Sequence, residues 1–272
     1  MAVKLAIFGA AGRMGRSMVQ NLADFPDLRL VAAVEVAGSP AAGVDAGTLA
    51  GLSSPLGVVV TTDAGAAVRD CDVAVDFTFH TAVPEHAALC ASFGRAFLVG
   101  TTALTDEERA AALAVGERAP VLVAANLSAG VNVLAALARR AAAVLGEDFD
   151  AEVVEMHHRH KKDAPSGTAL ALARAVADGR GLSPEAAAAA IRGGREGVCG
   201  ERPRGEIAVH ALRGGDVVGD HDIVFAADGE VLTLSHRATS RSCLSRGALR
   251  TALWLAAQPA GVHTVAESLG LE

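Results

Sequence analysis

The chain has 272 residues, 51% of them hydrophobic and 20% charged, and its formal net charge is −7. A chain of this length and composition is expected to fold around a packed core, as one large domain or two modest ones. Net negative charge opposes the phosphate backbone, so no nucleic-acid partner is expected.

The four cysteines are scattered and form no CxxC pair, which favours reduced thiols over a disulfide framework or a zinc site. Residues 1–10 pass from a short apolar run directly into a Gly/Arg turn, unlike a signal peptide. No stretch approaches the roughly 20 apolar residues that span a bilayer. We therefore expect a soluble, cytoplasmic protein with no membrane partner.

The first half of the chain alternates apolar runs with segments of helical composition. Strands are expected at residues 3–8, 28–34, 58–61, 73–77, 96–99 and 121–124, and helices at 14–22, 84–93 and 106–116. This alternation predicts an α/β fold, in which helices cover both faces of a parallel sheet.

The pattern changes after Asn126. Helices are expected at 131–145, 168–177 and 244–257, strands at 151–160, 207–212, 222–226 and 231–235, and a long loop at 193–205. Consecutive strands joined by short turns predict an antiparallel or mixed sheet in a second, α+β domain. By pattern alone, the final helix could pack against either domain.

The first strand and the first helix are joined by a glycine-rich turn, GAAGRMG at residues 9–15. Glycines there let a pyrophosphate approach the backbone N–H groups at a helix N-terminus. Glu35 ends the second strand, where an acid accepts hydrogen bonds from the adenosine ribose hydroxyls. The spacing is GxxGxxG instead of the usual GxGxxG, so a turn without a ligand stays an alternative.

Two more turns close expected strands, namely Gly100-Thr101-Thr102 and Ala124-Ala125-Asn126. Ligands of parallel sheets lie beyond the carboxyl ends of the strands, and small residues there leave room for a nicotinamide. Each segment alone is more often only a turn.

The segment EMHHRHKKDAPSGT, residues 155–168, contains two of the three lysines and three of the nine histidines of the chain. If it stays extended, His157, Arg159 and Lys161 share one face. Such a cationic cluster suits a small polyanion such as a dicarboxylate. The alternatives are a solvated surface run, a nucleic-acid patch, and a zinc site that the adjacent cations disfavour.

Ser166, Gly167 and Thr168 open the helix that follows. A helix N-terminus is a second place where a carboxylate can bind. The whole segment is therefore predicted to hold two carboxylates and to supply a proton donor.

Five motifs resemble those of the dihydrodipicolinate (4-hydroxy-tetrahydrodipicolinate) reductase family and stand in the family's order. They are GAAGRMGR at 9–16, DFT at 76–78, GTT at 100–102, AANLSAGVNV at 124–133 and EMHHRHKKDAPSGTAL at 155–170. The last is the most specific, and together they span nearly the whole chain.

The resemblance implies an N-terminal Rossmann-type dinucleotide-binding domain at residues 1–127 and a C-terminal α+β domain with an open mixed sheet at 128–239. Residues 240–272 are implied to be helices that return to the first domain. In the family, the second domain assembles a homotetramer.

The implied reaction is NAD(P)H-dependent reduction of 4-hydroxy-2,3,4,5-tetrahydrodipicolinate to 2,3,4,5-tetrahydrodipicolinate with loss of water, in lysine and diaminopimelate biosynthesis. By resemblance, His157 and Lys161 are catalytic, and the residues that bind the substrate are His158, Lys161, Ser166, Gly167 and Thr168. The implied cofactor contacts are Gly9, Ala10, Ala11, Gly12, Arg13, Met14, Glu35, Gly100, Thr101, Thr102, Ala124, Ala125, Asn126 and Leu127. No metal is implied.

Val36 and Phe79 stand where some family members carry basic residues that can hold the NADPH 2′-phosphate. NADH is therefore expected to serve at least as well as NADPH. Two alternative functions are another two-domain Rossmann dehydrogenase acting on a different small anion, and a regulator that binds NAD(H) without turnover. A semialdehyde dehydrogenase would need a cysteine in a recognisable motif, and a regulator has no need of the basic segment.

Overall fold

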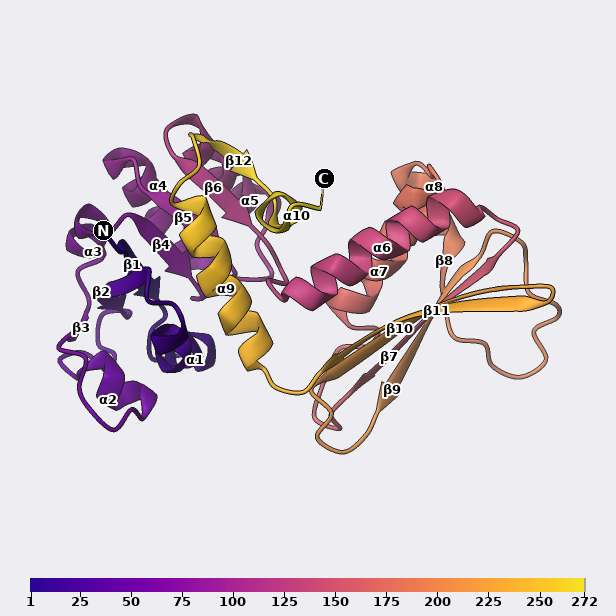
Figure 1. Cartoon of the computed structure of the whole chain (residues 1–272), viewed down its shortest axis with the longest axis horizontal. Helices are drawn as coiled ribbons and strands as arrows, with labels where there is room; N and C mark the ends of the chain where they lie inside the picture. Colours follow the sequence, from indigo (N-terminus) through magenta and orange to yellow (C-terminus); the bar gives the residue numbers. More distant parts are fainter. Residues whose placement is uncertain (272) are drawn as a thin grey trace. The chain divides into compact units, whose positions relative to one another are not determined.

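The computed structural model describes residues 1–271, and the chain divides into two compact units. Residues Met1–Ala129 and the described residues from Ser242 onward form the first unit, and Gly130–Arg241 form the second (Figure 1).

The first unit is a parallel sheet with helices on both faces, which confirms the predicted α/β class. Its strands are β1 (Val3–Phe8), β2 (Leu28–Val34), β3 (Val60–Thr61), β4 (Val73–Asp76), β5 (Ala96–Val99), β6 (Pro120–Val123) and β12 (Gly261–His263). Its α-helices are α1 (Arg13–Asn21), α2 (Ala46–Ala50), α3 (Ala64–Asp70), α4 (Val83–Phe93), α5 (Asp106–Leu113), α9 (Ser242–Leu255) and α10 (Val265–Leu269). Short 3₁₀ helices occupy Leu22–Asp24, His80–Ala82 and Ala114–Glu117.

The strand order β12-β6-β5-β4-β1-β2-β3 places β1 at the point where the order reverses. Alternate residues of β1 face opposite sides of the sheet. Leu5 and Ile7 pack in the core that includes α1 and α9, while Ala6 and Phe8 pack in the core that includes α3, α4 and α5. This is the order of a Rossmann-type sheet, whose ligands bind at the carboxyl ends of the strands near β1.

The second unit is a five-stranded sheet with helices on one face. Its elements are α6 (Ala129–Leu145), β7 (Asp150–His157), α7 (Gly167–Gly179), α8 (Pro184–Ala190), β8 (Ile191–Gly193), β9 (Ile207–Arg213), β10 (Gly219–Ala227) and β11 (Glu230–Ala238). The strand order is β11-β10-β7-β9-β8. β9 runs parallel to β7 and β8, and β10 runs antiparallel to β7 and β11, which confirms the predicted mixed sheet.

Helices α6 and α7 pack on the face of this sheet that contains Val153 and Phe225. The two helices approach closely because Gly179 has no side chain, and a Cβ there would lie 2.2 Å from the Arg139 carbonyl oxygen. Strand alternation places Leu212 and Val231 on the opposite face of the sheet, where they are 51% and 64% exposed.

Most expected elements are confirmed, and two strands are shorter than expected. The strand expected at 58–61 is reduced to Val60–Thr61, and the strand expected at 151–160 ends at His157. The strands β8 and β12 had no counterpart in the sequence pattern.

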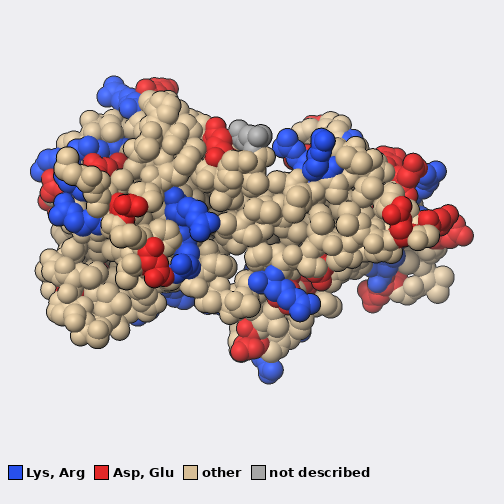
Figure 2. Space-filling view, in the orientation of Figure 1, with Lys and Arg blue, Asp and Glu red and all other residues tan. Residues whose placement is uncertain are grey.

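Basic and acidic side chains are interspersed on the face visible in Figure 2. Within residues 1–271, no helix is long and apolar enough to cross a membrane. Over the same range, no three His, Cys, Asp or Glu side chains are grouped so that they could hold a metal ion.

Candidate active site

The glycine turn after β1 is folded tightly against its neighbours. Gly9 has a φ of +76°, and a Cβ there would lie 2.4 Å from the Phe77 carbonyl oxygen. The N–H groups of Gly9 and Ala10 donate to the Val34 carbonyl oxygen, at 3.0 and 3.2 Å. Gly12 is the N-cap of α1 and offers no side chain to the first N–H groups of the helix. The turn therefore leaves backbone donors at a helix N-terminus, as pyrophosphate binding requires.

A cleft of about 830 Å³ opens beside this turn, and its lining includes Gly9, Ala11, Gly12, Glu35, Val36 and Phe79. Oε1 of Glu35 accepts a hydrogen bond from the Ala11 N–H at 2.7 Å. The cleft thus combines a glycine turn, a helix N-terminus and an acid, the groups that hold the adenosine half of a dinucleotide.

The other residues of the expected cofactor turn lie outside the lining of the cleft. Ala10 is 2% exposed, Met14 is half-buried and Arg13 is exposed. The titratable side chains that do line the cleft are Glu35, Glu85 and His86.

The expected cofactor segment after β5, Gly100-Thr101-Thr102, packs behind the residues that line the cleft and supports them. Oγ1 of Thr101 donates to Oδ1 of Asp76 at 2.7 Å and accepts from the Thr78 N–H at 2.9 Å. A Cβ on Gly100 would lie 2.3 Å from the Phe77 ring. Phe77 and Thr78 line the cleft, whereas Thr102 is exposed and does not.

The expected cofactor segment after β6 does not line this cleft. Leu127 is 3% exposed, and a Cβ on Gly247 of α9 would lie 1.8 Å from its carbonyl oxygen. Ala124 and Asn126 are half-buried, and Ala125 is exposed.

Sequence reasoning missed a buried pair next to the cleft. Oδ2 of Asp76, which is fully buried, lies 2.6 Å from Nδ1 of His86. The His86 ring lies 4.3 Å from the Phe8 ring and lines the cleft. Asp76 stands in the DFT motif, but nothing in the pattern of α4 singles out His86.

In the second unit, the basic segment turns back directly after β7. The strand ends at His157, and the Lys161 N–H donates to the His158 carbonyl oxygen at 3.1 Å. The alternation of faces expected for an extended segment therefore stops at His157, and the chain bends before Lys161.

The two residues expected to be catalytic each face an acid of this unit. Nδ1 of His157 lies 2.5 Å from Oε2 of Glu155, and the His157 side chain is 12% exposed. Nζ of Lys161 donates to both carboxylate oxygens of Asp163 at 2.8 Å. The hydrogen bond from Lys161 holds the pKa of Asp163 below its usual value.

His158 offers a hydrogen-bond donor without a partner. Desolvation, and next the charge of Arg241, lower the pKa of His158, so the ring is neutral near pH 7. Nη2 of Arg241 lies 3.2 Å from Nε2 of His158, which makes Nε2 the acceptor and leaves the hydrogen on Nδ1. That Nδ1 is buried and has no hydrogen-bond partner in the described part of the chain. A carboxylate is the kind of group that such a donor binds.

Ser166 is the N-cap of α7. Its Oγ accepts from the Ala169 N–H at 3.1 Å, its own N–H donates to Oε1 of Glu155 at 3.0 Å, and the residue is 2% exposed. Gly167 is exposed with open space around it, and Thr168 is half-buried. The positive end of the helix is therefore presented at Gly167 and Thr168, with Ser166 supporting it from behind.

Three residues that sequence reasoning did not single out belong to the same end of the sheet. Both terminal nitrogens of Arg213 donate to Glu155, at 2.8 and 2.9 Å. His221 is 4% exposed, and its ring lies 5.2 Å from that of His157. Burial, and next the charge of His157, lower the pKa of His221 to about 4. His236 pairs with His221 in the sheet. These residues carry no sequence signal because each stands inside an ordinary strand.

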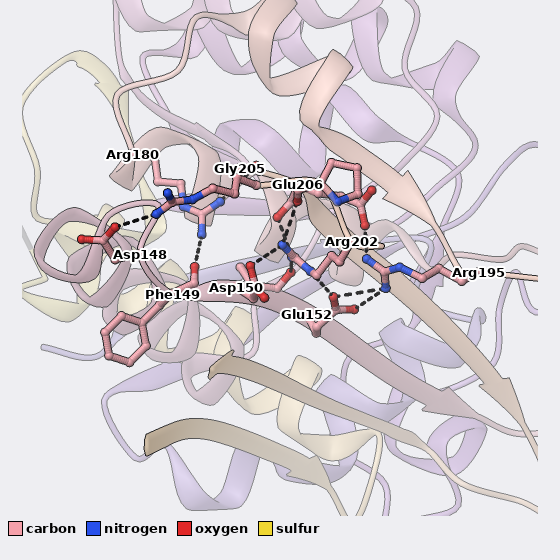
Figure 3. Close-up of polar contacts among 12 residues, drawn as sticks. Asp148, Phe149, Asp150, Glu152, Arg180, Arg195, Arg202, Gly205 and Glu206 are labelled. Atoms are coloured by element: carbon pink, nitrogen blue, oxygen red, sulfur yellow. Dashed lines mark hydrogen bonds and ion pairs between the residues drawn. The ribbon is translucent and has the colours of Figure 1, made fainter. Parts of the chain in front are cut away.

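The long loop between β8 and β9 belongs to the other end of β7 (Figure 3). Arg202 donates to Oδ1 of Asp150 at 2.6 Å and to Oε1 of Glu152 at 2.8 Å. Arg195 contacts Glu152 as well and forms an ion pair with Glu206. These ion pairs fix the loop at the start of β7, away from the basic segment at its end.

Two family models together match almost the whole chain. The model for the N-terminus of dihydrodipicolinate reductase matches residues 3–127, and the model for its C-terminus matches residues 130–269. A 4-hydroxy-tetrahydrodipicolinate reductase of Anaeromyxobacter dehalogenans is 47% identical over 268 residues, which is 98% of each chain. Another, of Parvibaculum lavamentivorans, is 46% identical over 272 residues, covering 99% of this chain and 98% of the relative.

Among solved structures, a dipicolinate-bound dihydrodipicolinate reductase from Paenisporosarcina sp. TG-14 matches with a TM-score of 0.76 at 24% identity. The match covers 99% of this chain and 100% of the other. The two chains therefore share a fold.

Proposed function

Because the chain belongs to the dihydrodipicolinate reductase family, we propose that it reduces 4-hydroxy-2,3,4,5-tetrahydrodipicolinate to 2,3,4,5-tetrahydrodipicolinate with loss of water. It is a pyridine-nucleotide-dependent oxidoreductase of lysine and diaminopimelate biosynthesis. The observation that carries the proposal is whole-chain similarity to such reductases at 47% identity. The two groups of residues described above support it, one suited to a dinucleotide and one to a dicarboxylate.

The cleft of the first unit fits a nicotinamide dinucleotide, which supplies the hydride when bound. Gly9, Ala11 and Gly12 line the cleft beside the N-terminus of α1, whose first-turn N–H groups suit a pyrophosphate, and Glu35 accepts from ribose hydroxyls. Val36 lines the cleft and is 74% exposed, so no cation there offsets the repulsion between Glu35 and a 2′-phosphate. NADH is therefore proposed to serve at least as well as NADPH.

The second unit is proposed to bind the two carboxylates of the substrate. Three groups support this assignment: the free Nδ1–H of His158, the ammonium of Lys161 and the positive end of α7 at Gly167 and Thr168. All three favour an anion, and each is able to form a charge-assisted hydrogen bond with a carboxylate.

His157 and Lys161 are proposed to carry the proton chemistry. When hydride reaches the ring carbon of the substrate, negative charge develops toward the ring nitrogen and the conjugated carboxylate. A histidine exchanges protons near neutral pH, and a lysine ammonium both pairs with a carboxylate and donates a proton.

The proposal includes a homotetramer assembled through the second unit. The sheet face opposite α6 and α7 exposes Leu212 and Val231, and exposed apolar sheet faces are commonly covered by a partner.

Residues 1–127 and 240–272 are proposed to bind the cofactor, and residues 128–239 are proposed to bind the substrate and to form the tetramer. A cytoplasmic location is also proposed, because all four cysteines are free thiols.

One assay tests the reaction. The protein is mixed with freshly generated substrate and NADH, and the absorbance of the reduced nicotinamide is followed. We expect oxidation that requires both substrate and protein. NADH binding without turnover would favour a regulator, and turnover of only a different small anion would favour another dehydrogenase.

A further inference from the structure

Glu155 occupies the centre of the basic cluster although its own side chain is fully buried. Oε2 lies 2.5 Å from Nδ1 of His157 and accepts from Arg213 at 2.8 Å. Oε1 accepts from Arg213 at 2.9 Å and from the Ser166 N–H at 3.0 Å. Both carboxylate oxygens are therefore fixed by partners from three separate segments.

The charge of this carboxylate determines which ring nitrogen of His157 carries a hydrogen. Burial acts to raise the pKa of Glu155, but hydrogen bonds from Arg213, His157 and the Ser166 N–H outweigh it and hold the pKa below its usual value. An ionised carboxylate only accepts hydrogen bonds, so the His157 nitrogen that faces it carries a hydrogen. Nε2 is then the ring nitrogen that is left to exchange a proton with a substrate.

The surroundings of Nε2 agree with that use. A Cβ on Gly219 would lie only 3.0 Å from Nε2 of His157, so glycine at this position keeps that edge of the ring uncrowded. The neighbouring His221 ring is neutral near pH 7, because burial lowers its pKa to about 4. It therefore places no like charge beside His157 when that ring is protonated.

We infer that Glu155 is the positioning residue of His157: it holds Nδ1–H, directs Nε2 toward the substrate, and is itself held by Arg213 and the Ser166 N–H. The inference rests on the proposed role of His157 in proton exchange. When the His157 imidazolium gives its Nε2 proton to the substrate, the ring becomes neutral and keeps its hydrogen on Nδ1, and solvent then returns a proton to Nε2. A buried carboxylate that fixes the tautomer of an imidazole is known to matter greatly for catalysis.

The test uses substitutions that separate orientation from folding. Glu155→Gln leaves the Arg213 guanidinium without its carboxylate, so Glu155→Gln with Arg213→Met, which removes both charges, is made as well. Arg213→Lys keeps a cation and leaves the carboxylate opposite His157. Glu152→Gln is the matched control. Glu152 is also a β7 carboxylate that contacts a histidine and an arginine, with His210 Nε2 at 2.5 Å, but it lies at the other end of the strand.

Two readouts are measured on the full-length protein: the tautomer of His157 by ¹⁵N NMR of labelled histidine, and kcat separately from KM. We expect the Nδ1–H tautomer in the wild type, Arg213→Lys and Glu152→Gln, and its loss in both Glu155 variants. With orientation lost, kcat should fall by about 10²-fold or more, while the affinity for dipicolinate changes far less.

The inference is overturned by a folded double variant that keeps the wild-type kcat, or by an unchanged His157 tautomer in that variant. A wild-type chain that does not turn over the substrate would defeat the proposed function instead. In that case the tautomer measurement still decides whether Glu155 positions His157.

Discussion

Nζ of Lys161 lies 2.8 Å from both carboxylate oxygens of Asp163, so the cation proposed to bind the substrate already holds an internal anion. The Asp163 side chain is 60% exposed, and the Lys161 side chain is 21% exposed. An exposed pair of this kind is worth only about 0–1 kcal/mol, so an incoming carboxylate is able to displace Asp163.

Asp163→Asn should therefore lower the KM for the substrate and the Kd for dipicolinate, by up to about fivefold. Steady-state kinetics and calorimetry measure the two constants. Asp216→Asn is the matched control, since it removes the same charge from an exposed position in a nearby turn. A higher KM in Asp163→Asn would mean that Asp163 places Lys161 for binding and does not compete.

His157→Gln and Lys161→Ala should each lower kcat by about 10²-fold or more, because general acid–base groups contribute roughly 10²- to 10⁴-fold. The affinity for NADH, measured by fluorescence titration, should barely change, because the cofactor cleft belongs to the first unit. His160→Gln and Lys162→Ala are the controls, since both residues are exposed neighbours. Near-normal kcat in folded His157 and Lys161 variants would favour the alternative that the basic segment is only a solvated surface run.

Val36→Arg should raise kcat/KM for NADPH by about tenfold, which corresponds to roughly 1.4 kcal/mol. Val36 lines the cleft and is 74% exposed, so an arginine there adds a cation at the cleft without repacking the core. Val144→Arg adds the same charge at a 71% exposed position on α6 and should not have this effect. In the wild type, a tenfold or larger preference for NADPH would contradict the cofactor proposal.

The stability of the protein should fall between pH 6.5 and pH 4 because of His221. Burial lowers its pKa to about 4 in the folded chain, against roughly 6.5 when unfolded. A lowered folded pKa means that the contribution is complete above about pH 6.5 and is lost as the pH falls toward 4. Between pH 7 and pH 5, His221→Gln should lose about 2 kcal/mol less free energy of unfolding than the wild type. Urea denaturation at several pH values measures this, and parallel pH dependences would refute it.

Leu212→Glu and Val231→Glu should break the proposed tetramer. Both side chains lie on the sheet face opposite α6 and α7 and are at least half exposed in the single chain, so a charge there opposes a covered interface. Light scattering should report about four times 27.5 kDa for the wild type and a smaller mass for the variants. Val144→Glu on α6 is the control, and a wild-type monomer would end the proposal.

Local signals explain what the sequence predicted well. The glycine turn is followed at once by α1, and Glu35 comes directly after β2, so the strand–turn–helix unit is visible within one segment. The family resemblance, read from five short motifs, is confirmed by the family models over residues 3–127 and 130–269. The motifs after β5 and β6 were less informative about contacts, because Thr101 and Leu127 are buried behind other residues.

The features that could not be predicted from the sequence depend on contacts between residues far apart in the chain. The segment after His157 turns because the Gly214 N–H donates to the His157 carbonyl oxygen and the Arg159 N–H donates to the Gly215 carbonyl oxygen. Glu155 gains its position from Arg213, which lies 58 residues later. The three residues of β12 are too few to show a pattern and become a strand only by pairing with β6.

The return of the chain to the first unit has a consequence for synthesis on the ribosome. Leu249 and Leu255 of α9 are fully buried in the core of the first unit, and β12 completes its sheet. The first unit therefore stays unfinished while the whole second unit is translated, for roughly ten seconds at typical rates. Throughout that interval the apolar residues that pack against α9 lack their partner, so we expect the nascent chain to need protection by chaperones until its last helices emerge.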